Sequence, residues 1–199
     1  MLHTMLENSV LIIPGITDSV TLACIARSRK YSQHCKAVED ALAGRCALCN
    51  PDWTYNTPVE IPSLKYWRVQ YCSPPEKFTR LHFLLIPLRH VMDSRELTTA
   101  EQLEYWVAMN ILPVMFNFTY RGILSRDGDA TMSSGTIRHL HIHMMVPDGT
   151  GRVESPFCKT PAEEAIGVAR AIIYEKIRTG TPFEALPLEE QALIQDRMS

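Results

Sequence analysis

Residues His139–Met145 read HLHIHMM, so that histidines alternate with large apolar side chains. Successive side chains of a β-strand point to opposite faces of its sheet, and this alternation therefore predicts a strand with three imidazoles on one face. Leu140, Ile142 and Met144 would share the other face, and we expect that face to pack on a hydrophobic core. The imidazoles are then left along a surface or cleft. Since seven histidines placed at random would rarely align three in this way, the row predicts a functional site.

The spacing of the three histidines limits how one metal ion can use them. At about 3.3 Å per residue, an extended strand separates His139 from His143 by roughly 13 Å. Zn–N bonds measure about 2.0–2.1 Å, so one zinc ion can take two adjacent members of the row but hardly all three. The three imidazoles must therefore divide their work.

A C-x-x-C pair, Cys46 and Cys49, offers further donors. Two thiolates on one tight turn are a usual half of a tetrahedral zinc site, and two histidines can complete it. The same pair also occurs as a redox group, and this alternative stays open. The better histidine donors are the triad, His90 and His82. His90 begins a connection and can reach a neighbouring element, whereas His82 lies inside an apolar strand pattern, where a packed or hydrogen-bonded imidazole is equally expected.

The composition is that of an ordinary globular protein. The chain has 199 residues, of which 46% are hydrophobic, and its 20 Lys+Arg against 22 Asp+Glu give a formal net charge of -2. This length suits one domain, or one domain with an appendage, that folds without disulfides. The near-zero net charge excludes an overall basic field of the kind that binds nucleic acid or anionic membranes without specificity.

The N-terminal part shows no membrane or secretion signal. Its longest apolar run, Val10–Ile16, contains Pro14 and Gly15 and falls far short of the roughly 20 residues that a spanning helix needs. It also lacks the charged start of a signal peptide. We therefore expect a cytoplasmic protein.

The order of the expected elements favours an α+β domain over a regularly alternating parallel one. A helix is expected over residues 18–43, with Gly44 as its C-cap, and Pro51–Pro62 reads as a loop. Capping boxes at Thr98 and Thr160 predict helix starts there, the first helix running to about Leu112 and the second ending near Gly180. Strands are expected at 65–72, 81–86, 120–124 and 139–146, a polar loop at 125–135, and a last helix near Pro187.

The triad segment resembles the His-φ-His-φ-His-φ-φ signature of the histidine triad (HIT) superfamily of nucleotidyl hydrolases and transferases. Leu81–Val91, which reads LHFLLIPLRHV, is similar to the family segment H-φ-L-V-I-P-K-x-H. With the C-x-x-C pair, the resemblance covers about residues 46–147. It implies an antiparallel sheet of about five strands with packed helices over residues 45–150. Residues 1–44 and 151–199 would then be helical extensions, the second packed on the same domain.

In family members that carry C-x-x-C, the pair joins two histidines on a structural zinc ion. Carried over to the matching positions, the resemblance implies Cys46, Cys49, His90 and His139 as the zinc ligands.

The resemblance also implies a mechanism. His141 would be the nucleophile that attacks the α-phosphorus of a nucleotide and forms a covalent nucleotidyl-histidine intermediate, because neutral imidazole has an unprotonated nitrogen near pH 7. His143 would lie beside the phosphate and stabilise developing charge. Gly135 and Thr136 match positions that supply backbone and hydroxyl donors to phosphate or to the leaving group. The expected substrates are dinucleoside polyphosphates, nucleoside phosphoramidates or similar small nucleotides, and the acceptor is water, phosphate or a sugar phosphate.

The sequence departs from the family in the loop before the triad, where HIT members of the Hint type usually have asparagine. Residues 125–129 read SRDGD, and Arg126 is either a phosphate ligand or a solvated loop arginine. The C-terminal tryptophan common in those members is also absent. Trp53, Tyr55 and Ile61 would line the base pocket or belong to the core.

Two other functions stay open. In the first, His139 and His141 hold a catalytic zinc ion with an open position for water, which makes the protein a metallohydrolase. In the second, the protein binds nucleotides in a regulatory role without useful catalysis. We expect a small nucleotide as ligand, no membrane and no nucleic acid as partner, and we allow for a homodimer.

Overall fold

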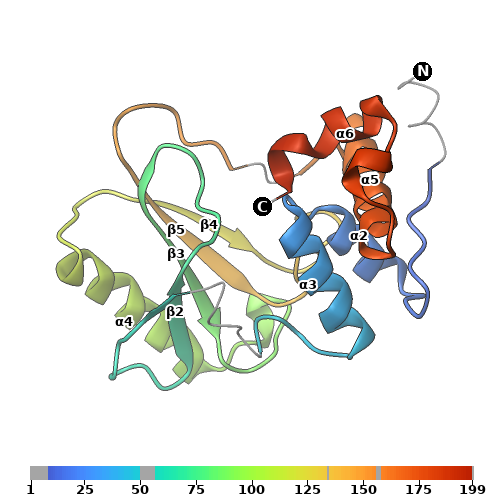
Figure 1. Cartoon of the computed structure of the whole chain (residues 1–199). Helices are drawn as coiled ribbons and strands as arrows, with labels where there is room; N and C mark the ends of the chain where they lie inside the picture. The colour runs from blue at the N-terminus through green and yellow to red at the C-terminus, as the bar shows by residue number, and fades with distance from the viewer. Residues whose placement is uncertain (1–8, 50–56, 134, 156–157, 199) are drawn as a thin grey trace. The chain divides into compact units, whose positions relative to one another are not determined.

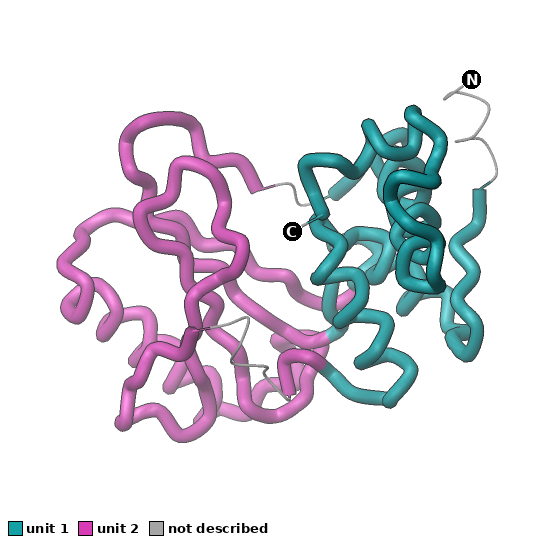
Figure 2. The backbone as a smooth tube through the Cα atoms, in the orientation of Figure 1, with its two compact units in different colours: residues 1–46, 130–138, 158–199 teal, residues 47–129, 139–157 magenta. Residues whose placement is uncertain are grey.

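The computed structural model of the chain describes residues 9–49, 57–133, 135–155 and 158–198. The chain divides into two compact units (Figure 2). Unit 1 comprises residues 1–46, 130–138 and 158–199, and unit 2 comprises residues 47–129 and 139–157. Residues 130–138 thus group with the two chain ends, which the sequence did not indicate. The expected division into a domain over residues 45–150 and two packed extensions stays a prediction.

Unit 2 is built on an antiparallel sheet of five strands (Figure 1). The sheet order is β1-β2-β3-β5-β4, and each neighbouring pair is antiparallel. The α+β class and the expected five-stranded antiparallel sheet are therefore confirmed. The strands are β1 (Pro58–Val59), β2 (Trp67–Tyr71), β3 (Thr79–Pro87), β4 (Gly122–Arg126) and β5 (His141–Pro147).

One face of this sheet carries the core of unit 2. Leu140, Ile142 and Met144 lie in that core with Phe83 and Leu85 of β3, which confirms the expected apolar face of the triad segment. Burial of each such side chain contributes about 1.5–3 kcal/mol to stability. The opposite face of β5 carries His141, His143 and Met145.

Helix α4 (Thr99–Met115) covers the core face and adds Ala108 and Leu112 to the core. Its capping box is formed as the sequence predicts, with the Thr98 hydroxyl accepting from the Glu101 N–H and the Glu101 carboxylate accepting from the Thr98 N–H. The helix continues through Pro113 to Met115, beyond the expected end at Leu112. Proline removes only its own N–H, and the Phe116 N–H still donates to the Leu112 carbonyl.

Two other expected bounds are wrong. Ser125 and Arg126, expected in a polar loop, belong to β4, and β1 lies inside the segment expected as a loop. The other strands agree with the sequence apart from small shifts at their ends. A short 3-10 helix, Ser94–Glu96, completes the unit.

Unit 1 is helical. Its main helices are α2 (Ser19–Ala26), α3 (Tyr31–Leu42), α5 (Pro161–Arg178) and α6 (Leu188–Ile194), with 3-10 helices at Phe183–Ala185 and Gln195–Arg197. The capping box at Thr160 is formed, and Gly44 follows α3 at a φ of +63°, which a glycine C-cap adopts without strain. No helix in the described ranges has the length and apolar character that a membrane span requires.

The expected single helix over residues 18–43 is wrong, because the chain breaks at 27–30. Lys30 is extended, at φ −134° and ψ 157°, and begins α3 as its N-cap. The Arg29 N–H donates to the Gln33 side chain rather than to a helical carbonyl. Arg27 ends α2, and its side chain is occupied by residues 130–135.

Candidate functional site

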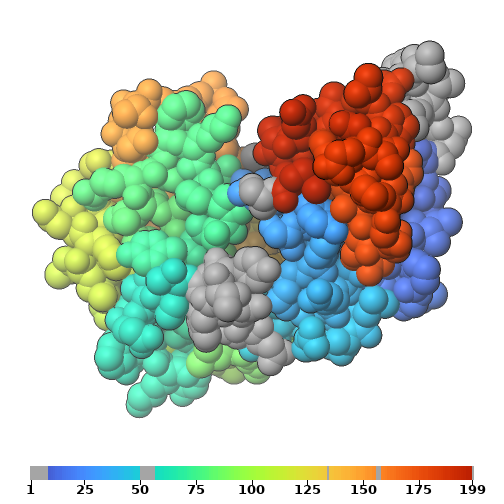
Figure 3. Space-filling model, in the orientation of Figure 1, coloured from blue at the N-terminus to red at the C-terminus, as the bar shows by residue number. Residues whose placement is uncertain are grey.

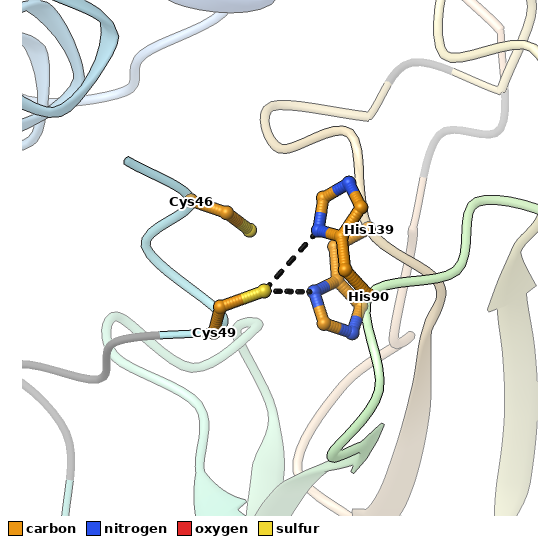
Figure 4. A group of neighbouring side chains, drawn as sticks. All are labelled: Cys46, Cys49, His90 and His139. Carbon is orange, nitrogen blue, oxygen red and sulfur yellow. Dashed lines mark hydrogen bonds between the residues drawn. The ribbon is translucent and has the colours of Figure 1, made fainter. Parts of the chain in front are cut away.

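Two thiols and two imidazoles form the first cluster. The ligand atoms of Cys46, Cys49, His90 and His139 all lie within 4.8 Å of one another (Figure 4). Cys49 Sγ lies 3.2 Å from His90 Nδ1 and 3.5 Å from His139 Nδ1. These are the four residues that the family resemblance implied as zinc ligands, and they could hold a metal ion.

Neighbouring strands of the sheet bring the two histidines of this cluster together. His90 follows β3 and His139 precedes β5, and β3 pairs with β5. The Leu140 N–H donates to the Val91 carbonyl at 2.7 Å, which extends the contact between these segments beyond the strands.

The hydrogen bonding of His139 suits a metal ligand. Its Nε2–H donates to the Pro87 carbonyl at 3.0 Å, so the lone pair of the neutral ring is on Nδ1, the atom that faces Cys49. Burial lowers the pKa of His139 to about 4, which keeps the ring neutral near pH 7. Two thiolates and two neutral imidazoles are a donor set that fits zinc, and the residues present therefore pass this chemical test.

His141 lies on β5 and is buried, with 5% of its surface exposed. Its Nδ1–H donates to the His139 carbonyl at 2.7 Å, which leaves the lone pair on Nε2. Burial lowers the pKa of His141 to about 4, and the positive charge of Arg126 acts in the same direction. A neutral ring with an unprotonated Nε2 is the state that a nucleophile requires.

His143 lies on the same face of β5 as His141 and is hydrogen-bonded to His82 of β3. The Glu76 N–H donates to His82 Nδ1 at 3.0 Å, so neutral His82 carries its proton on Nε2. That Nε2–H donates to His143 Nδ1 at 2.8 Å. Neutral His143 must then carry its own proton on Nε2. His82, whose role the sequence left open, thus sets the tautomer of His143.

Cys72, His82 and His143 also lie within 4.8 Å of one another and are all buried. Distance alone would make them a second metal group. The Glu76 N–H occupies the Nδ1 lone pair of His82, however, and Nε2 could bind a metal only if the ring lost its remaining proton. The group is better described as a hydrogen-bonded histidine pair beside a buried thiol.

Arg126, expected in a loop from the sequence, lies on a strand beside the triad. It is half-buried on β4 and paired directly opposite His141 on β5, so the two side chains share a sheet face. The sequence put it in a loop, because Asp127 and Gly128 mask the end of the strand. Extending the expected strand at 120–124 by two residues would have placed Arg126 on a strand and so revealed it as a neighbour of His141.

The geometry described above does not test the other predicted residues. Gly135 and Thr136 belong to unit 1, whereas His141 and His143 belong to unit 2, and their contact with phosphate stays a prediction. Trp53 and Tyr55 lie outside the described residues. Ile61 packs against the core of unit 2.

No family model and no curated protein matches this chain. Several solved structures do. A HIT family hydrolase from Clostridium thermocellum is 17% identical at a TM-score of 0.43, over 54% of this chain and 94% of that one. A zinc-bound histidine triad family protein from Mycobacterium smegmatis is 20% identical at a TM-score of 0.42, over 68% and 97%. The diadenosine triphosphate hydrolase of Plasmodium falciparum, solved with cyclomarin A, is 21% identical at 0.38, over 59% and 75%.

Proposed function

We propose that this protein is a histidine triad nucleotidyl hydrolase or transferase that acts at the α-phosphate of a small nucleotide. The observation that carries the proposal is the hydrogen bond from His141 Nδ1–H to the His139 carbonyl, which leaves Nε2 as the unprotonated ring atom. The low pKa of His141, about 4, keeps that atom available near neutral pH. The three solved proteins, by their names, include hydrolases.

The reaction then has two displacements. In the first, the Nε2 lone pair of His141 forms a bond to the α-phosphorus, and the bond from phosphorus to the leaving group breaks. The leaving group departs with that electron pair and takes up a proton if it is basic. In the second, water or another acceptor attacks phosphorus and gives up a proton, and the electron pair of the N–P bond returns to Nε2.

Two neighbours of His141 suit the charge that develops on the phosphoryl oxygens. Neutral His143 has an Nε2–H that can donate to an oxygen, because its Nδ1 accepts from His82. Arg126 is a permanent cation on the same sheet face as His141. We therefore add Arg126 to the phosphate-binding residues, beside the predicted Gly135 and Thr136.

We propose that the first cluster holds a structural zinc ion. Cys46, Cys49, His90 and His139 would hold it, and the ion would link three separate segments of the chain. No reaction step requires it.

A metallohydrolase with zinc on His139 and His141 has less support. In the part of the chain that the structure describes, the two candidate metal groups contain His139 and His143 but not His141. A nucleotide-binding regulator without turnover would share the site geometry and differ only in rate, so the experiment decides it.

The test is incubation with a panel of dinucleoside polyphosphates, nucleoside phosphoramidates and nucleotide sugars, followed by mass spectrometry of the intact protein and its peptides. A nucleotidyl adduct on His141 is expected in the wild type and not in His141→Ala, whose turnover is lost. His34→Gln is the matched control, because His34 is also a buried histidine but lies on α3 in unit 1. An unchanged rate in His141→Ala overturns the mechanism.

We also propose a homodimer formed through α4. After the first helical turn, the exposed positions of α4 carry no charge, and Leu103, Trp106 and Val114 are 64%, 60% and 82% exposed. Yellow-green residues, the colour of α4, reach the surface in Figure 3. A surface helix with an apolar outer stripe is typical of a protein interface. The expected cytoplasmic location and the expected lack of nucleic-acid binding stay predictions.

A further inference from the structure

Arg27, at the end of α2, donates hydrogen bonds from its guanidinium to the segment that precedes the triad. Its Nη1 donates to the carbonyls of Ala130, at 2.5 Å, and Gly135, at 3.4 Å. Its Nη2 donates to the Thr131 carbonyl at 2.9 Å. All of these residues belong to unit 1.

The remaining donors of Arg27 go to a carboxylate. Glu164, in the first turn of α5, accepts from Nε at 3.0 Å, and its Oε1 lies 2.9 Å from Nη2. Nε, Nη1 and Nη2 thus all donate hydrogen bonds, Nη2 also forms an ion pair with Glu164, and only 4% of the Arg27 side chain is exposed. A buried guanidinium is tolerated only with its charge and donors matched in this way, so the arrangement is specific to arginine.

The same helix holds the other end of the segment. Arg138 Nη1 donates to Asp18 Oδ2 at 2.9 Å, and Asp18 is the N-cap of α2, accepting from the Thr21 N–H at 3.0 Å. The N-terminal and C-terminal cap residues of α2 therefore each bind residues 130–138. These residues run directly into His139.

The orientation of one peptide unit follows from these contacts. The carbonyl and the N–H of a trans peptide unit point in opposite directions. Because the Gly135 carbonyl points at Arg27, the N–H of Thr136 points away from it. A backbone N–H fixed in this way, next to a threonine hydroxyl, is a donor pair that an anion can use.

We propose that Arg27 is a positioning residue, which holds residues 130–138 so that the Thr136 donors are preset for a nucleotide phosphate. This inference rests on the proposed function. It also assigns a role to the N-terminal and C-terminal parts of the chain, because Arg27 precedes the strands in the sequence and Glu164 follows them.

The test compares Arg27→Lys with Arg178→Lys. Lysine keeps the charge of Arg27 but cannot bridge three carbonyls and a carboxylate at once. Arg178 is the matched control, because it makes two hydrogen bonds of 2.7 Å to Glu175 within α5. We expect Arg27→Lys to lower kcat by about 10- to 100-fold and to speed amide hydrogen exchange in residues 130–138, whereas Arg178→Lys leaves both unchanged even where its Tm falls.

A second variant covers the case in which Arg27→Lys does not fold. Glu164→Gln keeps an acceptor for Nε and removes only the charge, and its side chain is 31% exposed. It should show the same two changes, smaller in size. Equal effects of the Arg27 or Glu164 variant and of the Arg178 variant on kcat and exchange would overturn the inference.

AMP binding separates this inference from the proposed function. If the wild type binds AMP but hydrolyses nothing in the panel, the proposed function fails. Arg27 is then judged by affinity, with AMP binding expected to be at least about tenfold weaker in the Arg27 variant that folds. Unchanged AMP affinity in that variant, or a wild type that neither binds AMP nor turns over any substrate of the panel, overturns the positioning role.

Discussion

His139, His141 and His143 occupy every second position of one segment, yet each ring has a different partner. His139 donates from Nε2 to a carbonyl, His141 donates from Nδ1, and His143 accepts at Nδ1 from His82. His139 therefore presents an unprotonated Nδ1, His141 an unprotonated Nε2 and His143 a protonated Nε2. In the proposed function, one residue type serves a metal site, a nucleophile and a donor because the backbone and one further histidine fix the tautomers.

Arg126 carries the first prediction. Arg126→Gln removes the cation opposite His141 and should lower kcat/KM by about 100-fold, because its charge is expected to act on the transition state. The kcat/KM of Arg126→Lys should lie between the values of the wild type and of Arg126→Gln. Initial rates on the best dinucleoside polyphosphate measure this effect.

Arg80→Gln is the matched control for Arg126, since Arg80 is a β3 arginine whose hydrogen bond to the Asn117 carbonyl is exposed. It should retain full activity. If Arg126→Gln is as active as Arg80→Gln, Arg126 is a solvated strand residue with no part in phosphate binding.

The site could be predicted from the sequence only as far as local patterns reach. The alternation at 139–145 gives the strand, its apolar face and the division of the histidines. The tautomers could not be predicted, because they depend on Pro87 and Glu76, which only the paired strands bring near. The same holds for Arg126, whose position opposite His141 is a matter of register.

At the scale of elements, features that depend on neighbouring residues could be predicted from the sequence, whereas a feature that depends on distant residues could not. Both capping boxes are formed, since Thr98 and Thr160 need only a glutamate three residues later. The break between α2 and α3 had no local signal in the form of proline or glycine. It lies where Arg27 binds residues 130–135, a partner about a hundred positions along the chain.

The cap of α4 carries a pH prediction. Hydrogen bonds from Arg89 and then from Thr98 lower the pKa of Glu101 to about 2 from a usual 4.5. A lowered folded-state pKa stabilises the protein above the unfolded value, and this contribution is lost as pH falls from about 4.5 to about 2. Glu101→Gln should therefore cost about 1–3 kcal/mol at pH 7, and the difference from wild type should shrink below pH 4.5.

Urea unfolding at pH 7 and at pH 3.5 measures this change. Glu189→Gln, at an exposed position in the first turn of α6, should cost less than about 0.5 kcal/mol at either pH. A Glu101→Gln deficit that is the same at both pH values would contradict the assigned role of the ionised carboxylate.

The cysteine–histidine cluster joins elements that are separate in sequence, and its metal is predicted to stabilise them. Cys49→Ser should reduce zinc in the purified protein to less than about half an equivalent, and it should lower Tm by about 4–8 °C, which corresponds to roughly 2 kcal/mol. Metal analysis and calorimetry measure the two effects. Cys158→Ser is the control, because Cys158 is exposed and lies outside the cluster. Full zinc content in Cys49→Ser would refute the site.

On the scale of the whole molecule, α4 differs from an ordinary surface helix, because its charged side chains are buried and several of its large apolar side chains are exposed. Its carboxylates point inward, where Glu104 accepts the backbone N–H groups of Lys65, Tyr66 and Trp67 at 2.6–2.8 Å. Its exposed face is instead uncharged, and beyond Thr99 it is apolar apart from Gln102 and Asn110. Since the carboxylates are already engaged by unit 2 itself, the apolar face is the part of the helix that is available to a partner.

We propose a second copy of the chain as the partner of this stripe. A twofold axis across α4 would place each stripe against its equivalent, so that no complementary surface on another protein is needed. Trp106→Glu should then bring two desolvated charges together and shift the protein from dimer to monomer, as measured by light scattering across a concentration series. Leu188→Glu is the control, because Leu188 is 80% exposed on α6 in unit 1 and should leave the mass unchanged. A wild type that stays monomeric at every concentration, or a Trp106→Glu variant that stays dimeric, would show that α4 is not the dimer interface.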